Sequence, residues 1–284
     1  MPQREETIRA MDNPINPDSS EPVPLLAEAR TPRGIQSVEV GGQLLKALVH
    51  TGRRMALKDL AQAADMTPAK AHPYLVSFGK IGLIEQDPAS GHYGLGPLAM
   101  QLGLISLQQV DPVRLVIAEL PHLAQRMGCT VSAAVWGAHG PTIIRVEEGP
   151  APVYVAMRHG TTASVRHTAT GKVFAAFRPA AEIAAVLSKD GLASGLDDPD
   201  FLAELAVIRR TRISQVRDQL LPGVSALAVP VFDGFGQMVL SIAAIGPSVL
   251  LDVTLQSGQA QLLRQAGQSL SQRLGAPSQA PFPL

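Results

Sequence analysis

The amino-acid sequence predicts an α+β protein whose two domains are joined by a helical linker. Residues 35–81 carry apolar side chains at helical spacing, residues 97–110 form a strongly apolar helical run, and strand-like runs prevail after Gly128. A chain of 284 residues with 46% hydrophobic and 17% charged residues can bury a core in each domain. We expect domains at 34–96 and 111–276, a linker helix at 97–110, and tails at 1–33 and 277–284.

The N-terminal tail is predicted to be disordered. Residues 1–33 contain six prolines among Glu, Asp, Asn and Ser, and they show no apolar period. We therefore assign no function to this tail.

The first domain is predicted to begin with three helices. One runs from Ile35 to Gly52, and a second runs from Leu57 to a break at Asp65-Met66. Thr67 is a favourable N-cap for a third helix, and Pro68 suits its first position. Four apolar residues of the third helix are spaced to face the core: Tyr74, Leu75, Phe78 and Ile81.

A β-hairpin is predicted after the helices. Leu83–Gln86 and Tyr93–Leu95 form its strands, around an Asp87–Gly91 turn that is rich in turn-forming residues. This order of elements is that of a winged helix-turn-helix, which reads the major groove of DNA, although such a trihelical core can also contact only protein. The residues expected to approach a duplex are Arg53, Arg54, Thr67, Lys70, His72, Ser77, Lys80, Ser90 and His92.

Composition limits how and where the protein acts. The 24 Lys+Arg balance the 24 Asp+Glu, so any binding of nucleic acid must come from a local patch. Cys129 is the lone cysteine, which excludes an intramolecular disulfide and favours a reducing compartment. Because no run of about 18 apolar residues and no signal-peptide pattern is present, we expect a cytoplasmic protein without a membrane partner.

The linker helix is predicted to pack against a second subunit. It carries more apolar surface than a solvated helix would expose, which favours a homodimer or tetramer. The residues concerned are Leu98, Leu102, Leu104, Ile105 and Leu107. Asp111-Pro112 then opens a further helix that ends at Gly128.

The second domain is predicted to be a mainly antiparallel sheet with helices beside it. Strands are expected at Val131–Trp136, Thr142–Glu147, Val153–Arg158, Ala226–Phe232 and Met238–Ile245. Helices are expected at 169–178, 180–188, 201–212 and 253–274.

No catalytic constellation is complete in the sequence. Thr170-Gly171-Lys172 lacks the spacing of a phosphate-binding loop, although the amides of Ala169–Gly171 can bind a small anion or form an ordinary helix cap. Gly223-Val-Ser225 lacks the second glycine of a nucleophile elbow, and no histidine follows His167. The histidines and Cys129 have no metal-ligand spacing. We therefore expect no enzymatic activity, no cofactor and no metal.

Five segments together carry a family resemblance: Arg33–Glu39, Asp87–Gly96, Arg145–Glu147, Ala169–Lys172 and Pro222–Asp233. With them the chain resembles IclR-type transcriptional regulators from about residue 33 to 274. The resemblance implies a winged helix that binds an operator in double-stranded DNA, a linker helix that dimerises, and a GAF-like C-terminal domain that binds a small effector. It implies transcriptional control without fixing activation or repression.

One departure from this family lies in the recognition helix. The family usually has arginine after the histidine, whereas Pro73 follows His72 here. A helix that starts at Pro68 would lose the hydrogen bond to the Ala69 carbonyl and kink, at a cost of about 3 kcal/mol. A helix that starts at Pro73 would lose its first turn instead. In both cases base readout must shift to other residues of the helix or to the wing.

A second departure lies in the effector site. Where the family has a carboxylate, a further acid in some members, a cysteine and two hydroxyls, this chain has Gln219, Val216, Ala226, Ala243 and Ile245. Such neutral and apolar positions would bind a tiny hydrophilic acid poorly and favour an aromatic or otherwise apolar carboxylate. The family's histidine before the loop is also displaced, with Arg166 at its place. The expected effector-binding residues are Arg166, Ala169, Thr170, Gly171, Gln219, Ala226 and Ala243.

The sequence thus predicts an effector-responsive, DNA-binding transcriptional regulator. The alternative is a ligand-binding sensor that acts through protein partners, with DNA binding weakened or lost through Pro73.

Overall fold

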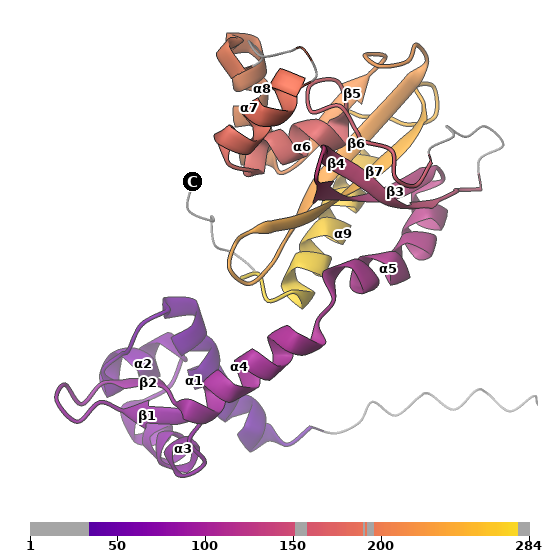
Figure 1. The fold of residues 1–284 in the computed structure, drawn as a ribbon. Helices are drawn as coiled ribbons and strands as arrows, with labels where there is room; N and C mark the ends of the chain where they lie inside the picture. Colours follow the sequence, from indigo (N-terminus) through magenta and orange to yellow (C-terminus); the bar gives the residue numbers. More distant parts are fainter. Residues whose placement is uncertain (1–33, 151–157, 190, 192–195, 278–284) are drawn as a thin grey trace, which may run out of the picture.

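The computed structural model describes residues 34–150, 158–189, 191 and 196–277, and Figure 1 shows their fold. An N-terminal domain and a larger C-terminal domain are connected through α4 (Pro97–Gln109) and α5 (Pro112–Met127). Residues 1–33 and 278–284 lie outside the described residues, as does most of the strand expected at Val153–Arg158. Within the described ranges, none of the helices has the length and apolar character needed to traverse a bilayer.

Three helices form the N-terminal core as the sequence predicts: α1 (Gln36–Thr51), α2 (Leu57–Ala63) and α3 (Pro68–Lys80). Gly52 ends α1 with φ 65°, a left-handed conformation that glycine adopts without strain. The Thr67 side chain caps α3 by accepting a hydrogen bond from the Lys70 amide at 3.3 Å. Leu44, Leu60 and Leu75 meet in the middle of the domain and are almost fully buried.

The third helix differs from the expected pattern at its end. Ile81 is 57% exposed, because α3 stops at Lys80 and Ile81 is the C-cap residue rather than a core position. Helix α3 starts at Pro68 and continues to Lys80, with Pro73 in its interior. The first of the two arrangements expected for Pro73 is therefore the one observed, with the proline itself exposed.

The predicted hairpin is present as two short antiparallel strands, β1 (Ile84–Gln86) and β2 (Tyr93–Leu95). Tyr93 also pairs with Met55, which ties the hairpin to the segment before α2. Gly96 lies so close to the backbone that a Cβ there would stand 2.5 Å from the Gly82 carbonyl oxygen. The hairpin is thus fixed against the three helices, and the domain is a winged helix-turn-helix.

A five-stranded antiparallel sheet forms the centre of the C-terminal domain, in the order β4-β3-β7-β6-β5. Its strands are β3 (Thr130–Gly137), β4 (Gly140–Glu147), β5 (Ser214–Arg217), β6 (Val224–Phe232) and β7 (Met238–Pro247). Strand β5 was not expected from the sequence, because its four residues are too few to show a period. The other four strands lie where they were predicted, each somewhat longer than expected.

Helices cover both faces of this sheet (Figure 1). On one face α5 and α9 (Gly258–Arg273) bury a core that includes Leu120, Leu227 and Leu263. On the other face lie α6 (Ala169–Phe177), α7 (Ala180–Lys189) and α8 (Pro199–Thr211). Helix α9 begins at Gly258 rather than at residue 253, because the Ser257 hydroxyl caps it through the Ala260 amide at 3.1 Å.

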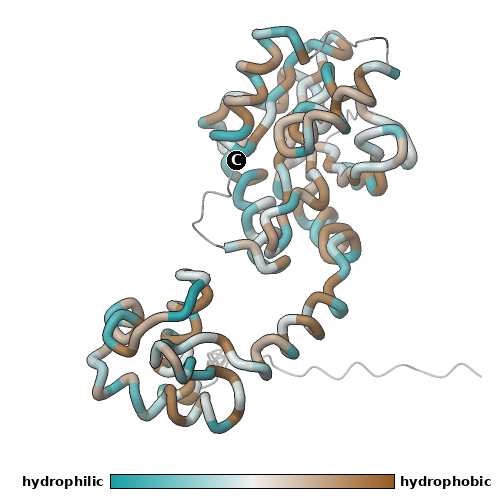
Figure 2. Tube along the Cα trace, turned by 60° about the vertical axis from the view of Figure 1, so that its left-hand side comes forward, coloured by the Kyte–Doolittle hydropathy of each residue, from teal (hydrophilic) through white to brown (hydrophobic). Residues whose placement is uncertain are grey.

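The linker helix α4 has no buried residue. Five of its apolar side chains are more than half exposed: Met100, Leu102, Leu104, Ile105 and Leu107. Figure 2 shows this apolar stretch on the segment that leads from one domain to the other.

Candidate DNA interface and effector site

The recognition helix presents its expected DNA-contacting residues to solvent. Thr67 at the N-cap of α3 is exposed, as are Lys70, His72, Ser77 and Lys80 on the helix itself. The Ser77 hydroxyl donates to the Pro73 carbonyl oxygen at 2.9 Å, a local bond to the preceding turn that competes with base contacts. Lys70 and Lys80 form no ion pair with any described carboxylate, so both charges are open to a phosphate.

Two expected contacts near the wing are engaged within the domain. The Arg54 guanidinium lies 2.5 Å from Glu85 and 3.6 Å from Asp87, both on the hairpin. The Ser90 hydroxyl donates to the Asp87 carboxylate, and this bond lowers the pKa of Asp87 below its usual value. His92 is half-buried beside the turn. Arg53 is exposed and makes no ion pair among the described residues, which leaves it as the freer of the two neighbouring arginines.

The expected effector positions on the strands share one face of the sheet. In the pairing of β5, β6 and β7, Val216 lies opposite Ala226, and Ala226 lies opposite Ile245. Ala243 lies in the next row of the same face, opposite Ala228. Directly opposed residues project to the same side, and this is the side that packs against α6. The structure therefore brings these positions together as an apolar floor, the name used below for Val216, Ala226, Ala243 and Ile245.

The start of α6 is built by close backbone contact with the preceding loop. The Thr168 hydroxyl accepts from the Gly171 amide at 2.9 Å and donates to the Ser164 carbonyl at 2.7 Å. A Cβ on Gly171 would lie 2.0 Å from that carbonyl oxygen, so only glycine fits. The Gly171 amide is thus an ordinary capped group, whereas the amides of Ala169 and Thr170 make no hydrogen bond within the described chain.

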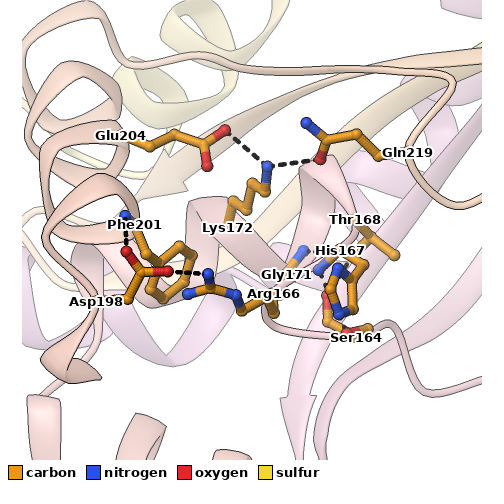
Figure 3. Close-up of polar contacts among 10 residues, drawn as sticks. All are labelled: Ser164, Arg166, His167, Thr168, Gly171, Lys172, Asp198, Phe201, Glu204 and Gln219. Carbon is orange, nitrogen blue, oxygen red and sulfur yellow. Dashed lines mark hydrogen bonds and ion pairs between the residues drawn. The ribbon is translucent and has the colours of Figure 1, made fainter. Parts of the chain in front are cut away.

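Arg166 is paired inside the protein, as Figure 3 shows. Its guanidinium donates to the Asp198 carboxylate and lies 4.7 Å from the centroid of the Phe201 ring. The hydrogen bond from Arg166 is also the main cause that lowers the pKa of Asp198. Because its charge is already compensated at the start of α8, Arg166 is less suited to a ligand carboxylate than the two amides of α6.

Lys172 is a buried cation beside the same loop, and no role was expected for it from the sequence. It is 2% exposed, and its Nζ donates to Glu204 at 2.7 Å and to the Gln219 Oε1 atom at 2.9 Å (Figure 3). Gln219 itself is exposed on the loop after β5. The sequence signal that was available is the apolar run Val173–Phe177 directly after Lys172, which indicates a buried helix.

The structure offers no support for the catalytic alternatives. Ser225 is fully buried in β6, and its Oγ lies 2.8 Å from the Ser248 Oγ rather than on an exposed elbow. Among the described residues, no group of three or more His, Cys, Asp or Glu side chains could hold a metal ion.

The comparisons with known proteins agree on one family. The family model described as "Bacterial transcriptional regulator IclR C-terminal" matches residues 106–272, and that of the "IclR helix-turn-helix domain" matches residues 37–88. The chain is 26% identical to the glycerol operon regulatory protein of Streptomyces coelicolor, over 86% of this chain and 98% of the relative. It is 26% identical to the transcriptional repressor IclR of Escherichia coli, over 79% of this chain and 84% of the relative.

A solved structure extends the likeness to the whole fold. The crystal structure of HmgR from Pseudomonas aeruginosa aligns with a TM-score of 0.77 and 32% identity, covering 86% of this chain and 100% of that chain. The two relatives from Streptomyces coelicolor and Escherichia coli are named as a regulatory protein and a transcriptional repressor. The chain therefore belongs to the IclR family of transcriptional regulators, with a DNA-binding helix-turn-helix domain and a ligand-binding C-terminal domain.

Proposed function

We propose that this regulator senses a small carboxylate effector with an aromatic or otherwise apolar body. The observation that carries the proposal is the apolar floor, whose members lie in adjoining positions of three strands beneath α6. The amides of Ala169 and Thr170 are available to a carboxylate at the start of that helix. The apolar body of such a ligand would contact the floor, and its carboxylate would accept hydrogen bonds from the two amides.

Apolar burial decides between effector classes. Removing ring-sized apolar surface from water contributes a few kcal/mol at about 25 cal/mol per Å². A two-carbon acid has almost no such surface, and its polar atoms would face side chains that cannot pair with them. The floor therefore favours aromatic acids over glyoxylate or pyruvate.

Calorimetric titration of the full-length protein tests this ranking. We expect benzoate-like acids to bind more tightly than glyoxylate or pyruvate, and Ala226→Leu to weaken the aromatic acids by filling the floor. Gln215→Leu is the matched control, because Gln215 is an exposed neighbour on β5 that projects to the opposite side. The reverse ranking, or unchanged binding in Ala226→Leu, would contradict the proposal.

We further propose that a homodimer or tetramer, paired through α4, places two winged helices on an operator. The exposed apolar side chains of α4 support the pairing, and the free charges of Arg53, Lys70 and Lys80 support contact with DNA phosphates. Such a regulator would act in the cytoplasm, where its operator lies. Footprinting on the DNA beside its own gene, with and without an aromatic acid, tests the response. A salt-independent signal, or no duplex binding, would favour a sensor that acts through protein partners.

A further inference from the structure

The strand beside the apolar floor carries two hydroxyl side chains in register with it. In the pairing of β3 with β7, Thr130 lies opposite Ile245 and Ser132 lies opposite Ala243. Opposed residues project to the same side of a sheet, with Cβ atoms about 5 Å apart. Thr130 and Ser132 therefore border the floor on the face that packs against α6.

Thr130 and Ser132 lie opposite Ile245 and Ala243, two positions where the family resemblance implies hydroxyl residues and this chain has apolar ones. Ile245 and Ala243 offer no hydrogen-bonding side chain, and the hydroxyls lie one strand away on β3. The four residues of the floor are consequently apolar, while Thr130 and Ser132 place hydroxyls along its β3 side and Ser214 places one beside Val216 on β5. Both Thr130 and Ser132 are buried, at 3% and 1% exposure.

The Thr130 hydroxyl is also left without a partner. Its Oγ1 atom is buried and makes no hydrogen bond with any described residue. A buried hydroxyl that forms no hydrogen bond is costly, and a valine of nearly the same shape would avoid that cost. The presence of threonine here is explained if the hydroxyl is satisfied when a ligand is bound.

We propose that Thr130, with Ser132 beside it, binds a second polar group on the effector. This inference rests on the proposed function and makes it more specific. The effector then has a carboxylate at the start of α6, an apolar body over the floor, and a hydroxyl or similar group that reaches β3. A hydroxylated aromatic acid has this arrangement, whereas an unsubstituted aromatic acid leaves the Thr130 hydroxyl unpaired.

A cycle of ligand and protein changes tests the contact. Calorimetry on the full-length protein compares benzoate and 3-phenylpropionate with their monohydroxylated counterparts, in the wild type and in Thr130→Val. We expect at least one hydroxylated acid to bind the wild type more tightly than its parent by about five-fold to ten-fold, the size of one net hydrogen bond. In Thr130→Val this gain should disappear, while the parent acids bind as before.

Stability supplies a second readout. If the hydroxyl is unsatisfied in the free protein, Thr130→Val leaves the melting temperature of the free protein unchanged or raises it. Ser214→Ala is the matched control, because Ser214 also has a buried, unpartnered hydroxyl on this face but lies on β5, three strands from Thr130. We expect Ser214→Ala to keep the preference for the hydroxylated acid.

Several outcomes would overturn the inference. One is equal binding of hydroxylated and parent acids by the wild type, and another is a tighter binding of the hydroxylated acid that survives in Thr130→Val. A third is a lower melting temperature of ligand-free Thr130→Val, which would mean that the hydroxyl is purely structural. If glyoxylate or pyruvate proves the better ligand, the apolar-body proposal fails. The Thr130 contact is then judged on that ligand, and unchanged affinity in Thr130→Val overturns it as well.

Discussion

Lys172 and Gln219 are joined by a hydrogen bond of 2.9 Å that ties the first turns of α6 to the loop after β5. The same ammonium lies 2.7 Å from the Glu204 carboxylate on α8, so one buried cation links three separate segments. Glu204 supplies the negative charge, and Gln219 supplies only a neutral carbonyl oxygen.

The first prediction concerns this charge balance. Glu204→Gln should lower the free energy of unfolding by about 2 kcal/mol, because it leaves a buried ammonium without a counterion. Adding Gln219→Glu to that variant should recover most of the loss by providing a carboxylate from the other side. Urea denaturation measures both. Gln219→Glu that fails to rescue would mean that Glu204 acts through packing and not through its charge.

The second prediction concerns the linker. Replacing Leu102 and Leu107 together by Glu should dissociate the assembly and weaken DNA binding in parallel, because both side chains would be buried between subunits. Light scattering at micromolar concentration and duplex titration follow the two effects. Val249→Glu is the control, since Val249 is 91% exposed in the C-terminal domain. A wild-type protein that is already monomeric would refute the pairing.

The third prediction separates two neighbouring arginines. Arg53→Ala should weaken binding to all duplexes alike and reduce the slope of log K against log salt by about one. Arg54→Ala should change that slope much less, because its guanidinium is engaged by Glu85 and Asp87. Equal slopes for the two variants would show that the wing ion pair opens on DNA.

The fourth prediction concerns the proline within the recognition helix. Pro73→Ala should stabilise the protein by about 1–2 kcal/mol, since it restores an amide that can donate to the Ala69 carbonyl. The gain from this hydrogen bond is partly offset because alanine gives the unfolded chain more conformational freedom than proline. Pro73→Arg should in addition tighten operator binding. Stabilisation without tighter binding by Pro73→Arg would indicate that this helix docks on DNA differently from its relatives.

The fifth prediction concerns alkaline pH. Burial raises the pKa of the Cys129 thiol from 9.0 to about 11. Well below pH 9 the thiol is neutral in both the folded and the unfolded state, and it contributes nothing to pH dependence there. Between pH 9 and pH 11 the unfolded chain ionises first, so stability falls as pH rises. Relative to Cys129→Ala, the wild type should lose about 1 kcal/mol between pH 8 and pH 10, measured by urea denaturation.

Local signals account for the parts of the fold that the sequence predicted. Asp111 and Gly128 bracket α5 because capping depends on residues adjacent in the chain, and both caps are formed as expected. Ala226 and Ala243 could be placed on one sheet because each lies in a long strand beside a recognisable turn. The charge compensation of Arg166 could not be predicted, since Asp198 follows it by 32 residues and meets it only when α8 packs on α6.

Strand register explains what was missed in the effector site. Thr130 lies beside the floor because it pairs with Ile245, which is far along the chain, and no local pattern specifies that pairing. Lys172 likewise showed only a failed phosphate-loop motif in the sequence, while its burial between Glu204 and Gln219 depends on the packed domain.

The apolar floor has a consequence for evolution and engineering. Its alanines stand on central strands whose backbone is held by hydrogen bonds on both sides, so exchanging one side chain alters the surface of the floor without moving the main chain. Ala226 and Ala243 carry the smallest side chains of the floor and lie on neighbouring strands. A biosensor for a different aromatic acid could therefore be obtained by single substitutions on β6 and β7, with the winged helix and its operator left unchanged.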